Sequence, residues 1–190
     1  MGVALILSRQ SLSSPCGVIL LFWPPHSGSL SPLNLTKEMS VVLNRDIVVI
    51  GGSLGGLQAL KVLLANLAAD LPAALLVVLH GGSATHDSLA RILDAAGPLP
   101  AEPAQDRVRF RPGRIYTAPK DVHMMIADGR IVLRRGPREN MVRPAIHPLF
   151  RSAASGYGSR VVAVLLSGML YDGAAGMQAV ALRLRTWRNR

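Results

Sequence analysis

Residues 46 to 56 read Asp-Ile-Val-Val-Ile-Gly-Gly-Ser-Leu-Gly-Gly, and they contain the clearest structural signal in the chain. A short β-branched run that ends in glycines is typical of a buried strand followed by a tight turn. Leucines then recur at helical spacing from Leu57 to Leu67, and this helix is expected to end before Pro72. The sequence therefore predicts a strand, a glycine turn and a helix in direct succession.

The alternation of strand and helix continues along the chain. Residues 74–79 form a second buried run that ends at His80, and residues 89–93 indicate another helix. A helix around residues 148–155 precedes a long buried strand over residues 160–166. We therefore expect an α/β fold with a doubly wound, mostly parallel sheet in a Rossmann-like, three-layer arrangement.

The middle of the chain has a different pattern. Residues 114–117, 122–126 and 130–133 are predicted to be short strands, and Asp128-Gly129 is a strong hairpin signal between the last two. We expect these three strands to form an antiparallel excursion, inserted in the sheet or added to its edge.

Composition narrows the function classes. The 190 residues are 49% hydrophobic and 17% charged, which favours a compact domain over a disordered one. The net charge of +10 raises nucleic acid as a partner, but the excess arginines gather in residues 107–143 and 183–190, where there is no recognisable nucleic-acid-binding motif. We expect no nucleic-acid partner. The single cysteine, Cys16, excludes a disulfide framework and a cysteine-based metal site. No apolar run approaches ~18 residues, so we expect no membrane insertion and a cytoplasmic location.

The glycine turn satisfies the G-x-S-x-G pattern of a nucleophile elbow over residues 51–55, with Ser53 as the serine. Neighbours without side chains leave such a serine accessible to substrate, and the N-terminus of the following helix stabilises developing negative charge. A phosphate-binding turn is the alternative interpretation. That alternative is weakened because Ser53 stands where a dinucleotide fingerprint has its middle glycine.

A serine nucleophile needs a base and a group that orients the base. His80 ends the second predicted strand, at the same sheet edge as Ser53, and Asp172 follows the strand over residues 160–166. Asp172 precedes a glycine, so a turn-forming role is an open alternative. The remaining histidines end no predicted buried strand; they are His26, His86, His123 and His147.

Five ordered blocks of sequence resemble the catalytic domain of the CheB-type protein-glutamate methylesterases of bacterial chemotaxis. They cover residues 50–56, 77–80, 112–119, 143–152 and 166–174. The resemblance implies hydrolysis of glutamyl methyl esters on the cytoplasmic domain of methylated chemoreceptors, and deamidation of certain receptor glutamines. It implies a Ser53, His80 and Asp172 triad, backbone N–H groups at Leu54 and Met169 that bind the oxyanion, and no metal or organic cofactor.

The resemblance also indicates how the chain is divided into domains. We expect an irregular N-terminal extension over residues 1–40, a methylesterase-like catalytic domain over residues 41–180 and a basic, aberrant tail over residues 181–190. Many members of the family carry an N-terminal receiver domain, which we expect this chain to lack, leaving a separate receiver or kinase as a regulatory partner. The tail departs from the family pattern and suggests a C-terminal truncation. His147 stands where relatives often have Asp.

Two other function classes stay open. One is a catalytically impaired domain that binds a receptor or another partner, because a truncated end would compromise the site. The other is a nucleotide-binding α/β module that uses the glycine turn as a phosphate cradle.

Overall fold

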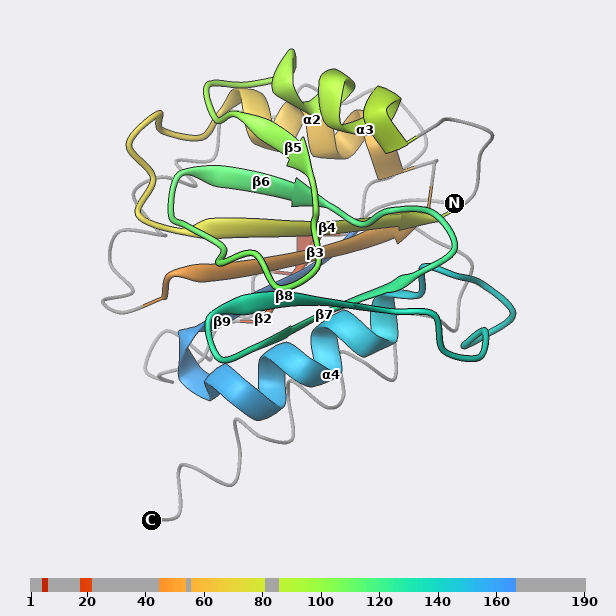
Figure 1. Cartoon of the computed structure of the whole chain (residues 1–190). Coiled ribbons are helices and arrows are strands. Elements are labelled where there is room, and N and C mark those ends of the chain that lie inside the picture. The colour runs from red at the N-terminus through yellow and green to blue at the C-terminus, as the bar shows by residue number, and fades with distance from the viewer. Residues whose placement is uncertain (1–4, 7–17, 22–44, 54–55, 81–85, 167–190) are drawn as a thin grey trace.

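The computed structural model describes residues 5–6, 18–21, 45–53, 56–80 and 86–166 (Figure 1). Its elements follow one another in chain order as strands β1 (Leu5–Ile6), β2 (Val18–Leu21) and β3 (Ile47–Ser53), helix α2 (Leu57–Ala65), strand β4 (Ala74–His80), helix α3 (His86–Asp94), strands β5 (Ala101–Pro103), β6 (Arg114–Thr117), β7 (His123–Ala127) and β8 (Arg130–Arg134), helix α4 (Ile146–Tyr157), the 3-10 turn η3 (Gly158–Arg160) and strand β9 (Val161–Leu166).

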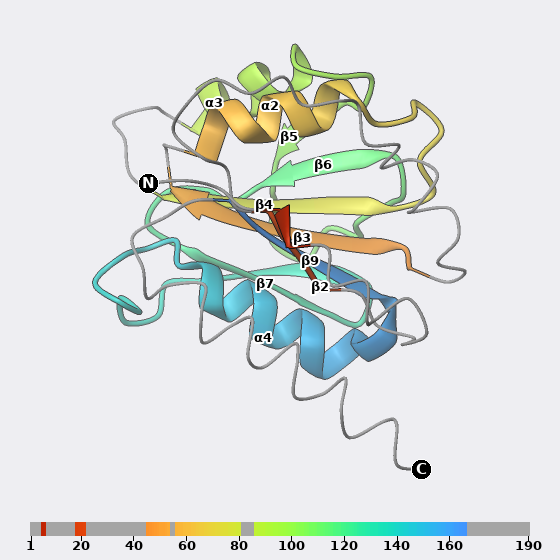
Figure 2. The same cartoon turned by 180° about the vertical axis from the view of Figure 1, so that it is seen from behind.

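The main sheet has β3 near its centre. The strand order is β1-β2-β9-β3-β4-β6-β5, and every neighbouring pair is parallel except β1 with β2 (Figures 1 and 2). From β3 the chain passes through α2 to β4 on one side, whereas β9 returns to the other side of β3 late in the sequence. The predicted mostly parallel α/β sheet is confirmed.

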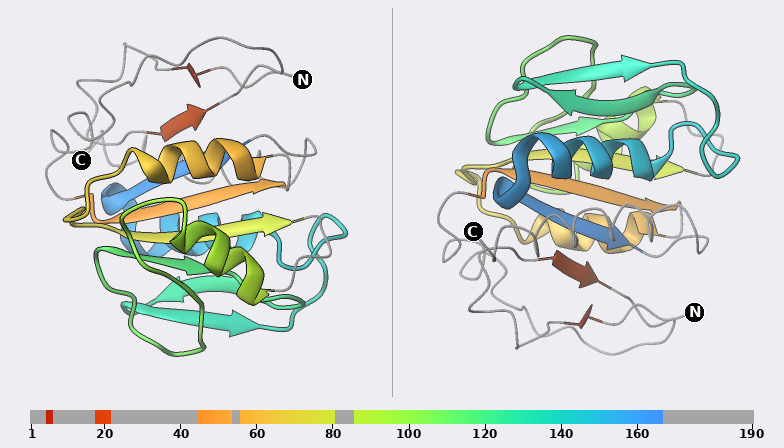
Figure 3. Two further views of the ribbon diagram at one scale, coloured as in Figure 1. Left: turned by 90° about the horizontal axis from the view of Figure 1, so that it is seen from above. Right: turned by 90° about the horizontal axis from the view of Figure 1, so that it is seen from below.

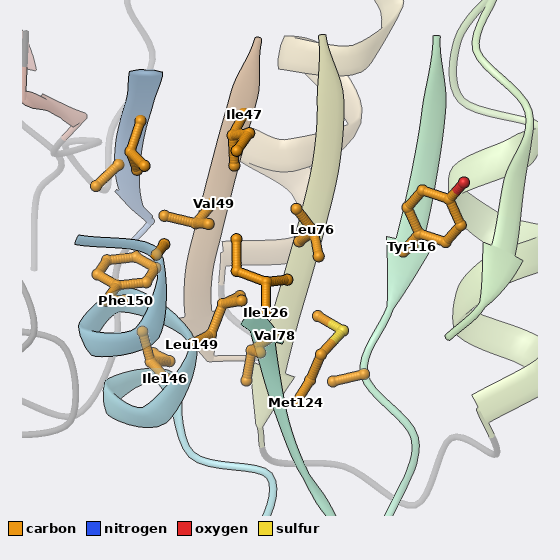
Figure 4. Close-up of a cluster of buried hydrophobic side chains, with 14 of the residues drawn as sticks. Ile47, Val49, Leu76, Val78, Tyr116, Met124, Ile126, Ile146, Leu149 and Phe150 are labelled. Atoms are coloured by element: carbon orange, nitrogen blue, oxygen red, sulfur yellow. The ribbon is translucent and has the colours of Figure 1, made fainter. Parts of the chain in front are cut away.

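Helices cover both faces of this sheet. Because successive side chains of a strand point to opposite faces, Ile47 and Val49 of β3 belong to one buried cluster, and Val48 and Ile50 belong to another. The first cluster packs against α4, β7 and β8, and Figure 4 shows its members between the sheet and α4. The second packs against α2 and α3 on the opposite face (Figure 3). The doubly wound, three-layer arrangement is therefore confirmed.

The antiparallel excursion is smaller than predicted. Strands β7 and β8 form a separate antiparallel pair joined by Asp128 and Gly129, both at positive φ, which suits the hairpin turn. The pair lies over the α4 face of the main sheet and does not extend its edge (Figure 3). Residues 114–117 form β6, which pairs in parallel with β4 and β5, so the prediction that they belong to the excursion is wrong. Strand β4 is distant from β6 in sequence and β5 is only three residues long, so no local pattern marks these two partners.

Two short strands lie within residues 1–40, where we expected an irregular extension. β2 pairs in parallel with β9, and β1 pairs antiparallel with β2. The expectation of irregular structure is wrong for these two segments, which extend the sheet beyond β9 on the side away from β3. The domain boundaries at residues 40 and 180 stay a prediction.

Candidate active site

Ser53 is the last residue of β3 and is half-buried at the carboxyl edge of the sheet. The glycines before it are required by close packing on both sides of the strand. A Cβ on Gly51 would come within 2.3 Å of Cγ2 of Ile146, and one on Gly52 within 2.6 Å of the backbone oxygen of Leu166. Strand β3 can thus lie against the first residue of α4 and the end of β9 only because it carries glycine here.

The turn after Ser53 leads directly into α2. Gly56 is the N-cap of that helix, and a Cβ there would meet Cβ of Leu166 at 3.0 Å. The first N–H groups of α2 have no intrahelical partner, and the helix dipole adds positive potential at this end. The elbow therefore joins a buried strand to a helix N-terminus, as the sequence predicts.

His80 is the last residue of the neighbouring strand. In the register of β3 with β4, Ser53 lies opposite His80. In the register of β3 with β9, Gly52 lies opposite Leu166, which ends β9. The ends of three parallel strands therefore meet at one edge of the sheet, at the point where the strand order reverses around β3. Open α/β sheets bind their ligands at such a point.

The other members of the predicted site lie outside the described residues. They are Leu54, Met169 and Asp172, and the side chain of His80 is outside the description as well. The structure brings together the backbone positions of Ser53 and His80. The triad and the oxyanion groups stay predictions.

A second histidine, His123, supports the segment that leads into α4. Its side chain is buried, Nε2 lies 2.8 Å from the backbone oxygen of Pro137, and Nδ1 lies 3.2 Å from the backbone nitrogen of Ala145. From the sequence, His123 is only a competitor of His80 for the role of base, and these contacts are not predicted. His123 lies on the face of β7 opposite to that of Met124 and Ile126, which belong to the core, so the strand pattern gave no sign of these contacts.

The same segment is tied down by Arg143. Its guanidinium donates to the Asp121 carboxylate, at 2.9 Å from Nε, and to the backbone oxygen of Gly136 at 2.6 Å. The hydrogen bond from Arg143, together with the positive charges of Arg143 and Arg135, lowers the pKa of Asp121 below its usual value of 3.8. Arg135 and Arg143 both pair with Asp121, so this one carboxylate, two residues before β7, ties down the segment that leads into α4.

A cavity of about 280 Å³ lies at the opposite edge of the sheet, near the amino ends of β3 and β4. Its lining includes the exposed ion pair of Asp46 with Arg160 and the ring of Tyr157. This cavity contains none of the predicted site residues.

Within the described residues, no group of three or more His, Cys, Asp or Glu side chains is arranged to hold a metal ion. None of the helices in that part of the chain is long and apolar enough to cross a membrane.

Comparison with known proteins identifies close similarities. The family model described as CheB methylesterase matches residues 48–184. A protein-glutamate methylesterase/protein-glutamine glutaminase of Methanosarcina acetivorans is 40% identical over an alignment of 156 residues, and the match covers 76% of this chain and 44% of the relative. A similarly named protein of Anaeromyxobacter dehalogenans is 44% identical over 133 residues, 69% of this chain and 39% of the relative. The chain thus spans less than half the length of these two relatives.

A solved structure is similar over most of the fold. The crystal structure of the CheB methylesterase catalytic domain of Thermotoga maritima superposes with a TM-score of 0.68 at 36% identity. The match covers 73% of this chain and 75% of that one.

Proposed function

Because this chain belongs to the CheB methylesterase family, we propose that it is a serine esterase that hydrolyses glutamyl methyl esters on chemoreceptors. The observation that carries the proposal is the register in which Ser53 lies opposite His80 at the ends of adjacent parallel strands. Side chains at the ends of neighbouring strands can come close enough for a hydroxyl to hydrogen-bond to an imidazole. The bond that activates a serine joins its oxygen to an imidazole nitrogen at ~3 Å, or somewhat longer without substrate.

The proposed reaction has two halves. His80 takes the proton of Ser53 as its oxygen attacks the ester carbonyl, and the same proton then leaves with the methoxide as methanol. A water molecule next attacks the acyl-enzyme, His80 accepts a proton from it, and the Ser53 oxygen departs with that proton. The products are methanol and a glutamate side chain, and the enzyme is unchanged.

The remaining residues have supporting roles in this proposal. Asp172 orients the imidazole of His80 and stabilises its positive charge. Backbone N–H groups at Leu54 and Met169 bind the oxyanion of each tetrahedral intermediate, and each contributes ~3 kcal/mol to transition-state stability. Deamidation of a receptor glutamine follows the same path with ammonia as the leaving group, because an amide carbonyl passes through the same oxyanion.

The proposed partner is the cytoplasmic domain of a methylated chemoreceptor, and the proposed location is therefore the cytoplasm. A separate receiver domain or kinase is the proposed source of regulation. The names of the relatives, which are methylesterases and glutaminases, support both proposed activities.

The test is methanol release from methylated receptor by the 190-residue chain, its Ser53→Ala variant and a Ser155→Ala control. Ser155 is exposed on α4, in a helix that contributes no proposed catalytic side chain. We expect release by the wild type and the control, and none above background by Ser53→Ala. Receptor binding without release by the wild type would instead support the partner-binding alternative, and full activity of Ser53→Ala would refute the proposed nucleophile.

A further inference from the structure

The first residue of α4 contacts the strand that carries Ser53. Ile146 is buried, and its side chain packs so closely on Gly51 that a Cβ there would lie 2.3 Å from Cγ2 and 3.0 Å from Cγ1. Gly51 precedes Ser53 by two residues, so the position of the helix start determines where the end of β3 can lie. Figure 4 shows Ile146 in the layer between α4 and the sheet.

The start of α4 lacks a capping side chain of its own. The N-cap residue is Ala145, which is fully buried in an extended conformation and has no side-chain hydrogen bond to offer. Serine, threonine, asparagine and aspartate are the usual residues at such a position. The backbone at the start of α4 therefore depends on a contact from another element.

His123 supplies that contact from strand β7. The backbone oxygen of Pro137 can only accept a hydrogen bond, so Nε2 carries the proton and donates to it. The backbone N–H of Ala145 can only donate, so Nδ1 accepts from it. These two partners require the neutral imidazole in one tautomer, and an apolar residue in its place would remove both hydrogen bonds.

We propose that His123 is a positioning residue for catalysis, acting on Ser53 through Ala145, Ile146 and Gly51. The inference rests on the proposed function in that Ser53 is taken as the nucleophile. The hydrogen bond from Ala145 fixes the first residue of α4, and the side chain of Ile146 then sets the position of β3 just before the elbow. Displacement of a reacting group by ~1 Å costs on the order of 100-fold in rate, so a shift at this contact reaches the chemistry.

Two amide variants separate the halves of the His123 contact. His123→Asn keeps an acceptor near the position of Nδ1, for the N–H of Ala145. His123→Gln keeps a donor near the position of Nε2, for the oxygen of Pro137. His123→Leu keeps neither. Ser152→Ala is the matched control, because Ser152 joins the same two elements by accepting from the N–H of Ile126 at 3.1 Å, farther along α4.

The measurements are kcat and KM for methanol release, the Tm of each variant, and amide hydrogen exchange of residues 50–53. We expect all four variants to lower Tm. At a temperature well below every Tm, His123→Leu and His123→Gln should lower kcat by about 10- to 100-fold with little change in KM. His123→Asn should retain most of the wild-type kcat, and Ser152→Ala should retain all of it.

The inference fails if kcat follows Tm across the four variants, or if His123→Asn loses as much kcat as His123→Gln. Failure of the proposed function is distinct, because the wild-type chain itself would then release no methanol. In that case amide hydrogen exchange still tests the role of His123. Residues 50–53 should exchange faster in His123→Leu and His123→Gln than in His123→Asn. Equal exchange in the three variants would overturn the inference.

Discussion

Replacement of Gly52 by alanine tests the packing at the elbow. The added Cβ would lie 2.6 Å from the backbone oxygen of Leu166 and 3.0 Å from Cδ2 of Leu79. An ordinary contact begins near 3.4 Å, so the strand end must move by about 0.8 Å from β9. Leu79 can change its rotamer, but the oxygen of Leu166 belongs to a parallel ladder and can move only with β9.

Such overpacking costs about 1 to 3 kcal/mol of unfolding free energy. Movement of the adjacent Ser53 by a similar distance should lower kcat by on the order of 10- to 100-fold. We would measure urea unfolding by circular dichroism and methanol release in parallel. Both quantities should fall, because one displacement causes both losses.

Gly156→Ala is the matched control. Gly156 lies within α4, and a Cβ there would meet nothing within 4 Å. Alanine should stabilise this helix position by about 0.5 to 1 kcal/mol and leave kcat unchanged. The packing account of the elbow would be refuted by a Gly52→Ala variant with the stability and the kcat of the wild type.

Three further substitutions test the rest of the fold. Asp121→Asn should lower the free energy of unfolding above pH 3.8, the usual pKa of this carboxyl. Because the pKa of Asp121 is lower in the folded chain, the difference from wild type should disappear as the pH falls through that lowered pKa. Urea unfolding at several pH values measures this difference. Asp46→Asn breaks the ion pair with Arg160, in which the side chains of Asp46 and Arg160 are 36% and 49% exposed. We expect the free energy of unfolding to fall by no more than about 1 kcal/mol. In thermal unfolding, high salt should make the difference from wild type smaller. Phe150→Ala empties a fully buried position under the sheet and should cost about 3 to 5 kcal/mol of unfolding free energy.

Much of the sheet could be predicted from the sequence because its buried strands are continuous apolar runs. Successive side chains of residues 47–50 and 74–79 point to opposite faces of the sheet, and both faces are covered. Every position in these two runs must therefore be apolar. The order of strands is harder to obtain. β5 is only three residues long and ends at Pro103, and β6 looks like part of the hairpin that follows it until its parallel partners are known.

The sequence also led to the position of Ser53 and to the strand end that carries His80. A G-x-S-x-G turn between a strand and a helix marks a local geometry, and the parallel order of strands brings the neighbouring end beside it. The contacts of His123 could not be predicted in this way, because they join β7 to backbone groups at residues 137 and 145. Such contacts depend on tertiary packing and leave no spacing pattern in the chain.

The most direct test of Ser53 as nucleophile is covalent labelling by a fluorophosphonate, which phosphonylates activated serines. Trypsin should release residues 46–61 as one peptide, in which Ser53 is the only hydroxyl side chain. We predict a phosphonyl adduct on this peptide in the wild type, and none in Ser53→Ala. An unmodified 46–61 peptide in a labelled wild-type chain, or an adduct that persists in Ser53→Ala, would contradict the assignment of Ser53 as the nucleophile.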